Sequence, residues 1–529
     1  MKKLDYKEYL ANVMPCVSFG ILCGAVTGGA IFLFKLAAKW LETLSRHLYA
    51  ASIGSPVAII AVFAVLILCA LVMILLHRRV PESKGGGIPR SEGVLRGVLH
   101  FEWRGTFFGT LAGSMLSYLA GLPLGSEGPA VLIGTSLGKL CGGFSRDSAA
   151  LGRYVMTGGA GAGFAVATGA PLSGLLFALE EIHKRFTPML VLTVSMSVVS
   201  ATLVNHLLCA VAGISPALFT FDTLPAFSLS HVGWLFLLGI LIALAVGIFD
   251  ASLSVWNKFS AKLGHRFPDA AKIIAVFLIT GVCGFCFTDA IYSGHDIIHE
   301  VLAHDRSLLY LAGLFLLRLA LMLLVTDSGA TGGIFIPTLA IGILASSLSA
   351  RLMLSLGMPP EIADAAVVLG MCAFIGGTLR APLTAAVLFV ELTGQFTGFF
   401  PVALVIFTVN AITEMLHQTP FYDRALENLV EAQNHGREPV MGCFEAKIAP
   451  DAFVIGKAIR DIMWPPACTV ISITRADSSI RDMDNDGDKK LYAGDTIVVR
   501  ARYFDEADIR RQLHGLVGDA HEILPAQLQ

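Results

Sequence analysis

The segment Leu124–Pro129, LGSEGP, places a single acidic residue, Glu127, among glycines and a proline inside an apolar region. A helix that begins in such a region presents unpaired N–H groups and the positive end of its dipole. Glycines let this backbone approach a ligand closely, and a proline in the first turn removes no donor that the helix needs. The segment therefore predicts an anion site built from backbone groups. A carboxylate there would compete with the anion while ionised and free the site when protonated, so Glu127 could both block an anion and carry a proton.

Two further segments have the same G-x-x-x-P spacing, Gly85–Pro89 (GGGIP) and Gly333–Pro337 (GIFIP). Glycines at such positions could serve only the close packing of helices, which is common in membrane proteins. Three such helix starts, two of them in repeated positions, favour a ligand site.

The apolar part of the sequence repeats itself. Gly125–Gly134 matches Gly333–Gly342 as G-x-x-x-P-x-x-x-I-G at an offset of 208 residues. Ala170–Glu180 matches Ala381–Glu391 at an offset of 211, with nine residues from proline to glutamate in both. Two matches at nearly one offset predict two homologous halves, possibly inverted, that meet at a site near the middle of a membrane. Their shared acids, Glu180 and Glu391, are expected to be structural.

The elements that position these residues are membrane helices. Hydrophobic residues make up 55% of the 529 positions, charged residues only 15%, and the mean hydropathy is +0.71, far from the values of soluble proteins. Pro129–Gly138 and Ala170–Leu179 are too short to cross a membrane alone, which predicts broken and re-entrant helices. We therefore expect an all-α polytopic membrane protein. The apolar runs that indicate spanning helices are Pro56–Leu76, Met189–Val204, Gly233–Phe249 and Ile273–Thr288.

The charge of the chain gives no indication of nucleic-acid binding, since the formal net charge is -2 and the pI about 6.7. No secretory signal peptide is recognised at the start. Basic residues expected on the cytoplasmic side are Lys2, Lys3, Lys7, Arg78, Arg79, Lys184 and Arg185.

The last part of the chain has a different composition, because 27 of the 78 charged residues lie in the last 93 positions. We expect a membrane domain over residues 1–434 and a water-facing α+β domain over residues 435–529. The expected elements of the second domain are helices at Ile455–Met463 and Asp505–Leu516 and strands at Cys468–Thr474 and Thr496–Arg502. Asp482–Gly487 opens like a calcium-binding loop, but Ala493 stands where a bidentate glutamate is needed, so a polar turn is expected instead. No metal or cofactor is predicted.

Six motifs resemble those of the CLC chloride channels and chloride/proton antiporters over residues 10–432. The resemblance implies a homodimer in the cell membrane, with both chain ends cytoplasmic and one anion pathway in each subunit. Its ligands would be chloride and protons. The motifs are GGGIP at 85–89, GSEGP at 125–129, GGIFIP at 332–337, LEEI at 179–182, RAPLTAAVLFVELT at 380–393 and PFYD at 420–423.

The resemblance also assigns roles to residues. Glu127 corresponds to an external gate whose carboxylate occupies the outer anion site, and Glu181 to an internal proton-transfer glutamate. Because Glu181 has no counterpart in the second half of the repeat, where Leu392 follows Glu391, it is a functional candidate in its own right. Alternatively, Glu181 could be an ordinary acid at a helix end, beside Lys184. The residues expected around the anion are Gly86, Ser126, Gly128, Ile334, Phe335 and Tyr422, with Ile334 and Phe335 acting through their N–H groups and Tyr422 through its hydroxyl. Tyr422 could instead be an interfacial anchor.

Two departures from the family pattern leave alternatives open. Many relatives carry serine at the position of Gly86, so nitrate, fluoride or another anion could replace chloride. Relatives often have arginine or lysine at the position of Ser126, and the loss of that charge should weaken the attraction of anions to the outer site. The presence of Glu181 favours an antiporter over a passive channel and over the fluoride-exporting branch. A membrane-embedded enzyme has no support, since no catalytic cluster is recognised.

The C-terminal segment 438–526 resembles the C-terminal module of Trk-type potassium-uptake regulators, the RCK C-terminal domain. This resemblance implies a regulatory domain that could bind a small molecule or mediate dimerisation.

Overall fold

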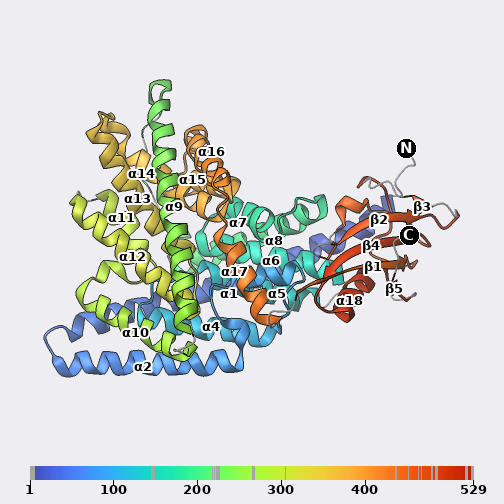
Figure 1. Cartoon of the computed structure of the whole chain (residues 1–529), viewed down its shortest axis with the longest axis horizontal. Helices are drawn as coiled ribbons and strands as arrows, with labels where there is room; N and C mark the ends of the chain where they lie inside the picture. Colours follow the sequence, from blue (N-terminus) through green and yellow to red (C-terminus); the bar gives the residue numbers. More distant parts are fainter. Residues whose placement is uncertain are drawn as a thin grey trace.

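The computed structural model of the chain has two parts, a large body of helices and a small sheet domain beside it (Figure 1). The start of α1 (Tyr6–Ser52) lies on the side of the body that faces the sheet domain (Figure 1). The structure describes residues 6–143, 149–216, 219, 221, 225, 227–264, 268–303, 306–434, 438–450, 452–462, 464–465, 468–477, 481–482, 487–518 and 522–525.

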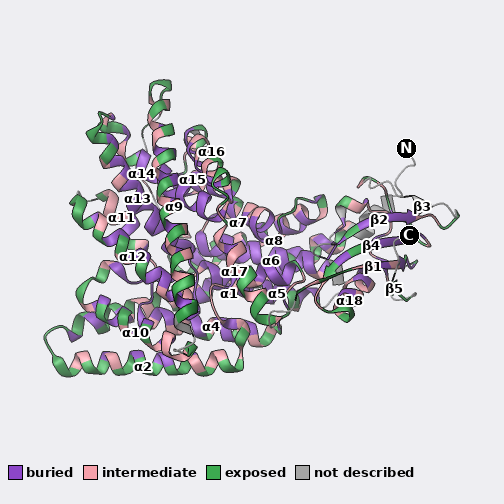
Figure 2. Ribbon diagram, viewed as in Figure 1, coloured by how far each residue is buried: buried purple, intermediate pink, exposed green. Residues whose placement is uncertain are grey.

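Within these residues, eight helices are long and apolar enough to cross a membrane. Three of the four uncharged runs of the sequence lie within α2, α8 and α9, and the fourth, Ile273–Thr288, overlaps α10, which begins at Asp269 and ends at Cys286. The outer helices expose large apolar side chains, as at Val57 and Ile60 of α2, and such a surface suits lipid (Figure 2). The chain is a multi-span membrane protein. The long helices after α1 are α2 (Pro56–Arg79), α8 (Pro188–Ala212), α9 (Val232–Gly264), α10 (Asp269–Cys286), α12 (Leu308–Ser328), α13 (Phe335–Ser355) and α14 (Ala363–Leu379).

The centre of the body holds helices that are buried on all sides, with α13 and α14 buried along most of their length (Figure 2). Several shorter helices begin or end inside the body, as the glycine and proline interruptions predict. The remaining helices of the body are α3 (Ile88–Leu95), α4 (Trp103–Ala120), α5 (Glu127–Gly142), α6 (Ala149–Thr168), α7 (Pro171–Phe177) with a π-helical turn (Ala178–Ile182), α11 (His295–Ala303), α15 (Pro382–Thr393), α16 (Phe399–Met415) and α17 (Phe421–Gln433).

The two halves of the repeat cap each other's helices. Glu180 accepts hydrogen bonds from the N–H groups of Leu383 and Thr384 at the start of α15, at 3.0 and 2.7 Å. Glu391 accepts the equivalent bonds from Leu172 and Ser173 at the start of α7, at 2.7 and 2.8 Å. Each carboxylate also accepts a bond from the hydroxyl of the Thr384 or Ser173 side chain. The prediction that both acids are structural is confirmed, because each satisfies the free donors of a helix N-terminus.

The sheet domain follows α17 and is antiparallel, with the strand order β3-β2-β4-β1-β5 and α18 packed against it. The expected strands and the second expected helix are present. The helix expected at Ile455–Met463 is wrong: the described part of this segment contains only a short 3-10 turn, and Ile455 and Ala458 form bridges with Leu491 and Lys490. The apolar spacing of this segment is satisfied by strand-like pairing, and Gly456, at φ +75°, interrupts any helix.

The elements of this domain are β1 (Val440–Lys447), β2 (Thr469–Thr474), β3 (Arg481–Asp482), β4 (Thr496–Tyr503), α18 (Glu506–Val517) and β5 (Leu524–Pro525). Asp484 and Asp486 of the expected polar turn lie outside the described residues.

The sheet domain contacts the helical body through α18 and the connection between α3 and α4. His100 Nε2 lies 3.1 Å from Asp508 Oδ2, and Gln512 donates a hydrogen bond of 3.2 Å to the carbonyl of Gly97. Gly97 lies at φ +75°, a backbone conformation that favours glycine, and a Cβ atom there would lie 2.6 Å from the end of the Gln512 side chain.

Candidate anion site

The glycine-rich helix starts, which are far apart in the sequence, meet at the centre of the body. Gly125 and Gly333 exchange two backbone hydrogen bonds of 2.7 Å, and their segments run antiparallel there. The third start joins them through bonds from Gly85 N–H to Gly329 O and from Gly332 N–H to Gly85 O, at 3.0 and 3.3 Å. The N-termini of α3, α5 and α13 therefore converge.

Some of these glycines are required for packing. A Cβ atom at Gly128 would lie 1.9 Å from the carbonyl oxygen of Gly86, and one at Gly333 would lie 2.6 Å from the nitrogen of Gly128. The two interpretations of the glycines are thus compatible, because close packing of the backbones is what brings the helix N-termini together.

Glu127, the first residue of α5, lies at this convergence and is 1% exposed. Its Oε1 accepts a hydrogen bond of 3.1 Å from the hydroxyl of Ser126. The N–H groups of Glu127 itself and of Ile336, in the first turn of α13, interact with the carboxylate. Its Oε2 has no hydrogen-bond partner among the described residues. The carboxylate therefore occupies a position where backbone donors of two helix N-termini favour an anion.

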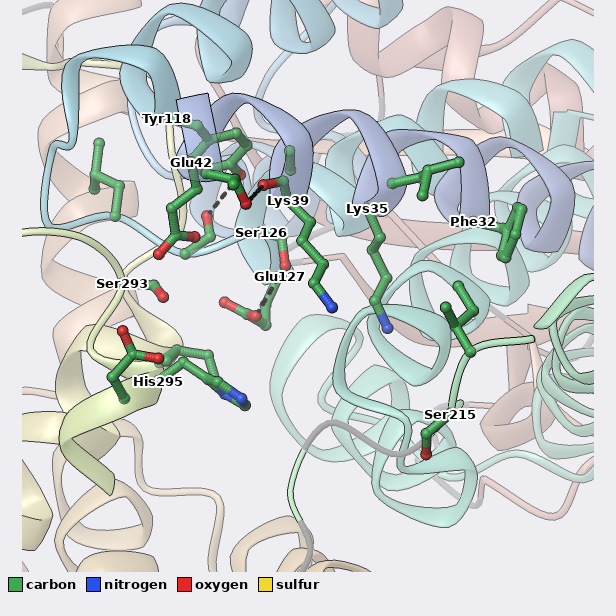
Figure 3. A pocket seen from close by; sticks show the side chains of 18 of the residues that line it. Phe32, Lys35, Lys39, Glu42, Tyr118, Ser126, Glu127, Ser215, Ser293 and His295 are labelled. Carbon is green, nitrogen blue, oxygen red and sulfur yellow. Dashed lines mark hydrogen bonds between the residues drawn. The ribbon is translucent and has the colours of Figure 1, made fainter. Parts of the chain in front are cut away.

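Two cavities approach this point. The Glu127 cavity, of about 750 Å³, is lined by Gly125, Ser126 and Glu127 from the glycine motif and by residues of α1 (Figure 3). The Tyr422 cavity, of about 710 Å³, is lined by Gly86, Ile334 and Tyr422 among other residues. Leu124 lines both cavities. Gly125, which pairs with Gly333, lines the Glu127 cavity, and Gly332 and Ile334, on either side of Gly333, line the Tyr422 cavity.

Tyr422 is the second residue of α17 and is 1% exposed, which is unlike the half-exposed ring of an interfacial anchor. Its hydroxyl has no hydrogen-bond partner among the described residues although it is buried. A buried hydroxyl without a partner is costly unless a ligand or water binds it. Its position in the wall of the Tyr422 cavity therefore suits an anion.

Two of the residues predicted around the anion, Gly128 and Phe335, do not line either cavity. The ring of Phe335 packs against Phe164 and Phe177, with centroid distances of 4.9 and 6.2 Å. Phe335 can therefore contribute to the site only through its backbone N–H, as the sequence predicts.

Glu181 lies in the π-helical turn after α7, buried and outside both cavities. Lys184, which could have paired with it, binds Asp423 and lies 3.2 Å from Glu92 instead. Glu181 Oε1 has no hydrogen-bond partner among the described residues. Deep burial without an ion pair among the described residues is unusual for an acid at a helix end.

Sequence reasoning missed the charged face of α1. Lys35, Lys39 and Glu42 line the Glu127 cavity together with Arg46. Their spacing of four, three and four residues places them on one side of a helix, and this pattern within an apolar run was the available signal. No cluster of three or more residues able to hold a metal ion occurs among the described residues.

Comparison with known proteins gives one consistent result. A sequence model of the family described as voltage gated chloride channel matches residues 68–414, more than half of the chain. The H(+)/Cl(-) exchange transporter ClcA of Vibrio parahaemolyticus is 28% identical over 421 residues, which cover 78% of this chain and 89% of that protein. ClcA of Yersinia pseudotuberculosis is 28% identical over 432 residues, covering 79% and 88%. These relatives are transporters and not enzymes.

Solved structures agree with the sequence comparison. A slow cyanobacterial Cl-/H+ antiporter superposes with a TM-score of 0.73 at 28% identity, covering 79% of this chain and 99% of that one. A CLC-type fluoride/proton antiporter shares the fold, with a TM-score of 0.61 at 19% identity over 78% and 98% of the two chains. With its repeated halves and converging helix N-termini, the chain belongs to the voltage gated chloride channel family, the CLC family.

Proposed function

We propose that this protein exchanges chloride for protons across the cell membrane, as a homodimer with one anion pathway in each subunit. The observation that carries the proposal is the position of Glu127. Its buried carboxylate lies on backbone donors that suit an anion, in the wall of the Glu127 cavity, which shares Leu124 with the Tyr422 cavity. An ionised Glu127 closes this route to chloride, and a protonated one leaves the donors free, so that chloride and a proton occupy the site in alternation.

Coupled exchange also needs a proton route that the anion does not share. Glu181 is the second proton carrier on this route, because it is buried and lies outside both cavities. A proton that reaches Glu127 by way of Glu181 does not have to pass through the Tyr422 cavity. Chloride and protons would then share only the segment near Glu127.

The names of the relatives support this activity. The ClcA proteins are described as H(+)/Cl(-) exchange transporters, and the cyanobacterial structure as a Cl-/H+ antiporter. These three proteins match 78–79% of the chain at 28% identity.

We place the Glu127 cavity on the external side and the Tyr422 cavity on the cytoplasmic side. Lys84 and Arg90 line the Tyr422 cavity, and the basic end of α2, with Arg78 and Arg79, precedes it in the chain. An excess of basic residues is typical of the cytoplasmic side. The start of α1 and the sheet domain lie together (Figure 1). We assign both to the cytoplasmic side, together with the Tyr422 cavity, so that both ends of the chain are cytoplasmic.

The experiment that distinguishes exchange from passive conduction is the voltage of zero chloride flux in proteoliposomes. With the chloride gradient held fixed, an exchanger shifts this voltage when a pH gradient is added, because the proton gradient contributes to the driving force. A passive channel keeps the voltage at the chloride equilibrium value, and this result would refute the proposed exchange.

Position 86 is where the preference between chloride and other anions can be tested. A serine there would supply a hydrogen-bond donor that Gly86 lacks. A Cβ atom there would meet nothing closer than the Gly332 carbonyl, at 3.6 Å, so a serine side chain fits. We expect Gly86→Ser to strengthen chloride binding by about tenfold, since a hydrogen bond to a charged group contributes about 1.5–3 kcal/mol. Calorimetric titration of chloride and nitrate checks this, with Gly86→Ala as the control that adds the Cβ atom alone. Equal affinities of the serine and alanine variants would show that position 86 does not face the anion.

We further propose that residues 435–529 form a regulatory domain that acts on the transport domain, residues 1–434. Support comes from its contact with the connection between α3 and α4, which follows the helix that carries Glu92. Glu92, in α3, lies beside Lys184, which also binds Asp423. A displacement of the connection would therefore move α3 and change the position of Glu92 relative to these two residues. A small-molecule ligand bound to the domain would act by the same route.

The contact should depend on pH. The neighbouring carboxylate of Asp508 raises the pKa of His100, and His100 in turn lowers the pKa of Asp508. The stabilisation from His100 is complete below its ordinary pKa of about 6.5 and is lost as the pH rises through the raised value, whereas that from Asp508 needs a pH above about 4. We expect hydrogen exchange in α18, corrected for intrinsic rates, to be slower at pH 6 than at pH 8.5. The same pH difference in His100→Gln would contradict this assignment.

A further inference from the structure

The Glu127 cavity has one wall made by α1, and the charged residues of that wall are not equivalent. Arg46 is neutralised, because it lies 2.7 Å from Glu42 and 2.6 Å from Asp296. Neither Lys35 nor Lys39 forms an ion pair within the part of the chain that the structure describes. The cavity therefore retains two positive charges that no acid of its wall neutralises by direct contact.

Lys35 is held in a fixed position. Its Nζ donates a hydrogen bond of 2.8 Å to the carbonyl of Val166, near the C-terminal end of α6. The negative end of that helix favours the ammonium group, and the bond orients the group without cancelling its charge. Lys35 interacts electrostatically with Glu127, although no hydrogen bond joins the two side chains.

Lys39 lies one turn further along α1 and is exposed. Figure 3 shows the side chains of Lys35 and Lys39 extending side by side from α1 into the cavity that holds Glu127. A cation bonded directly to Glu127 would hold the carboxylate in place. Lysines that do not bond to the carboxylate can attract anions into the cavity. The carboxylate then remains free to titrate and to move.

Ser126 has a different task in this arrangement. Its hydroxyl donates a hydrogen bond to Glu127, and the motif Gly125–Pro129 contains no basic residue. The positive charge that the motif lacks is present on α1 instead.

We propose that Lys35 and Lys39 attract external chloride to the Glu127 cavity, to which the motif Gly125–Pro129 contributes no basic residue. This inference rests on the proposed function, since it names residues that determine how that transporter captures its anion.

The test measures initial chloride uptake by proteoliposomes as a function of external chloride, at ionic strengths of about 20 mM and about 300 mM, where the screening length differs several-fold. The variants are Lys39→Gln and the double variant Lys35→Met/Lys39→Gln. Lys262→Gln, an exposed lysine outside the cavity, is the matched control. Monodispersity in detergent verifies that each variant folds.

At low ionic strength, we expect the half-saturating external chloride concentration of the double variant to rise by about three- to tenfold, at or below the lower end of the roughly 10- to 1,000-fold range of electrostatic steering. The maximum rate, the proton-to-chloride ratio and the half-saturation for internal chloride should remain unchanged. High salt should remove most of the difference, and Ser126→Arg added to the double variant should restore the affinity. Lys262→Gln should behave as the wild type.

An unchanged half-saturation and salt dependence in both lysine variants would overturn the inference and leave the proposed function intact. A change of equal size for external and internal chloride would also overturn it, since that is the result of a structural defect. A wild-type protein that transports no chloride would refute the proposed function, and the inference with it.

Discussion

Replacing Glu127 with alanine abolishes chloride-driven proton movement and leaves chloride movement intact. The carboxylate is the group on the anion route that can carry a proton, and it occupies the donors that chloride would use. Without it, chloride meets no gate and protons have no carrier. We expect proton movement to fall by about 100-fold or more, the scale on which a positioned proton carrier accelerates transfer. Paired recordings of chloride and pH in proteoliposomes measure both fluxes.

Two further variants make this result specific. Glu127→Gln, which imitates the protonated side chain, should also lose proton movement. Ser126→Ala removes the hydrogen bond to the carboxylate but keeps the carboxylate itself, and should retain coupling. Proton movement at the wild-type rate in Glu127→Ala would refute the assignment of the gate.

Replacing Glu181 with glutamine should block protons while chloride still moves. Glutamine preserves the shape of the side chain but cannot release and rebind a proton near neutral pH. The chloride route should survive, because Glu181 lines neither cavity. We expect proton movement to fall by about 100-fold or more, as for any positioned proton carrier. The chloride rate should fall less. It falls because Glu127 must then be protonated by another route.

The neighbouring acid provides the matched control. Glu180 differs from Glu181 by one position but accepts hydrogen bonds from the start of α15. Glu180→Gln should therefore lower the thermal stability of the protein and preserve the proton-to-chloride ratio. Loss of coupling in Glu180→Gln with full coupling in Glu181→Gln would reverse the assignment of the two acids.

The sequence predicted the features that depend on local pattern or on the repeat. The membrane helices, the short helices at the glycine motifs and the structural role of Glu180 and Glu391 follow from hydropathy, helix-terminus chemistry and the matching halves. The burial of Glu181 agrees with its lack of a counterpart in the second half.

Features that arise from contacts distant in the sequence could not be predicted in this way. The exchange of hydrogen bonds between Gly125 and Gly333 depends on how two helices pack, and so does the division of the pathway into two cavities. The helix expected at Ile455–Met463 was wrong because its apolar residues are satisfied by pairing with a segment more than 25 residues away. The role of Lys35 becomes visible only when α1 is placed beside the start of α5.

Chloride-driven proton transport is the measurement that tests the central claim most directly. Purified protein in liposomes is given a chloride gradient and no pH gradient, with potassium and valinomycin setting the voltage, while the external pH is followed. Coupled exchange predicts that protons move against their electrochemical gradient for as long as chloride moves down its own. Chloride flux that reaches equilibrium without any proton movement would contradict the account and leave a passive anion channel.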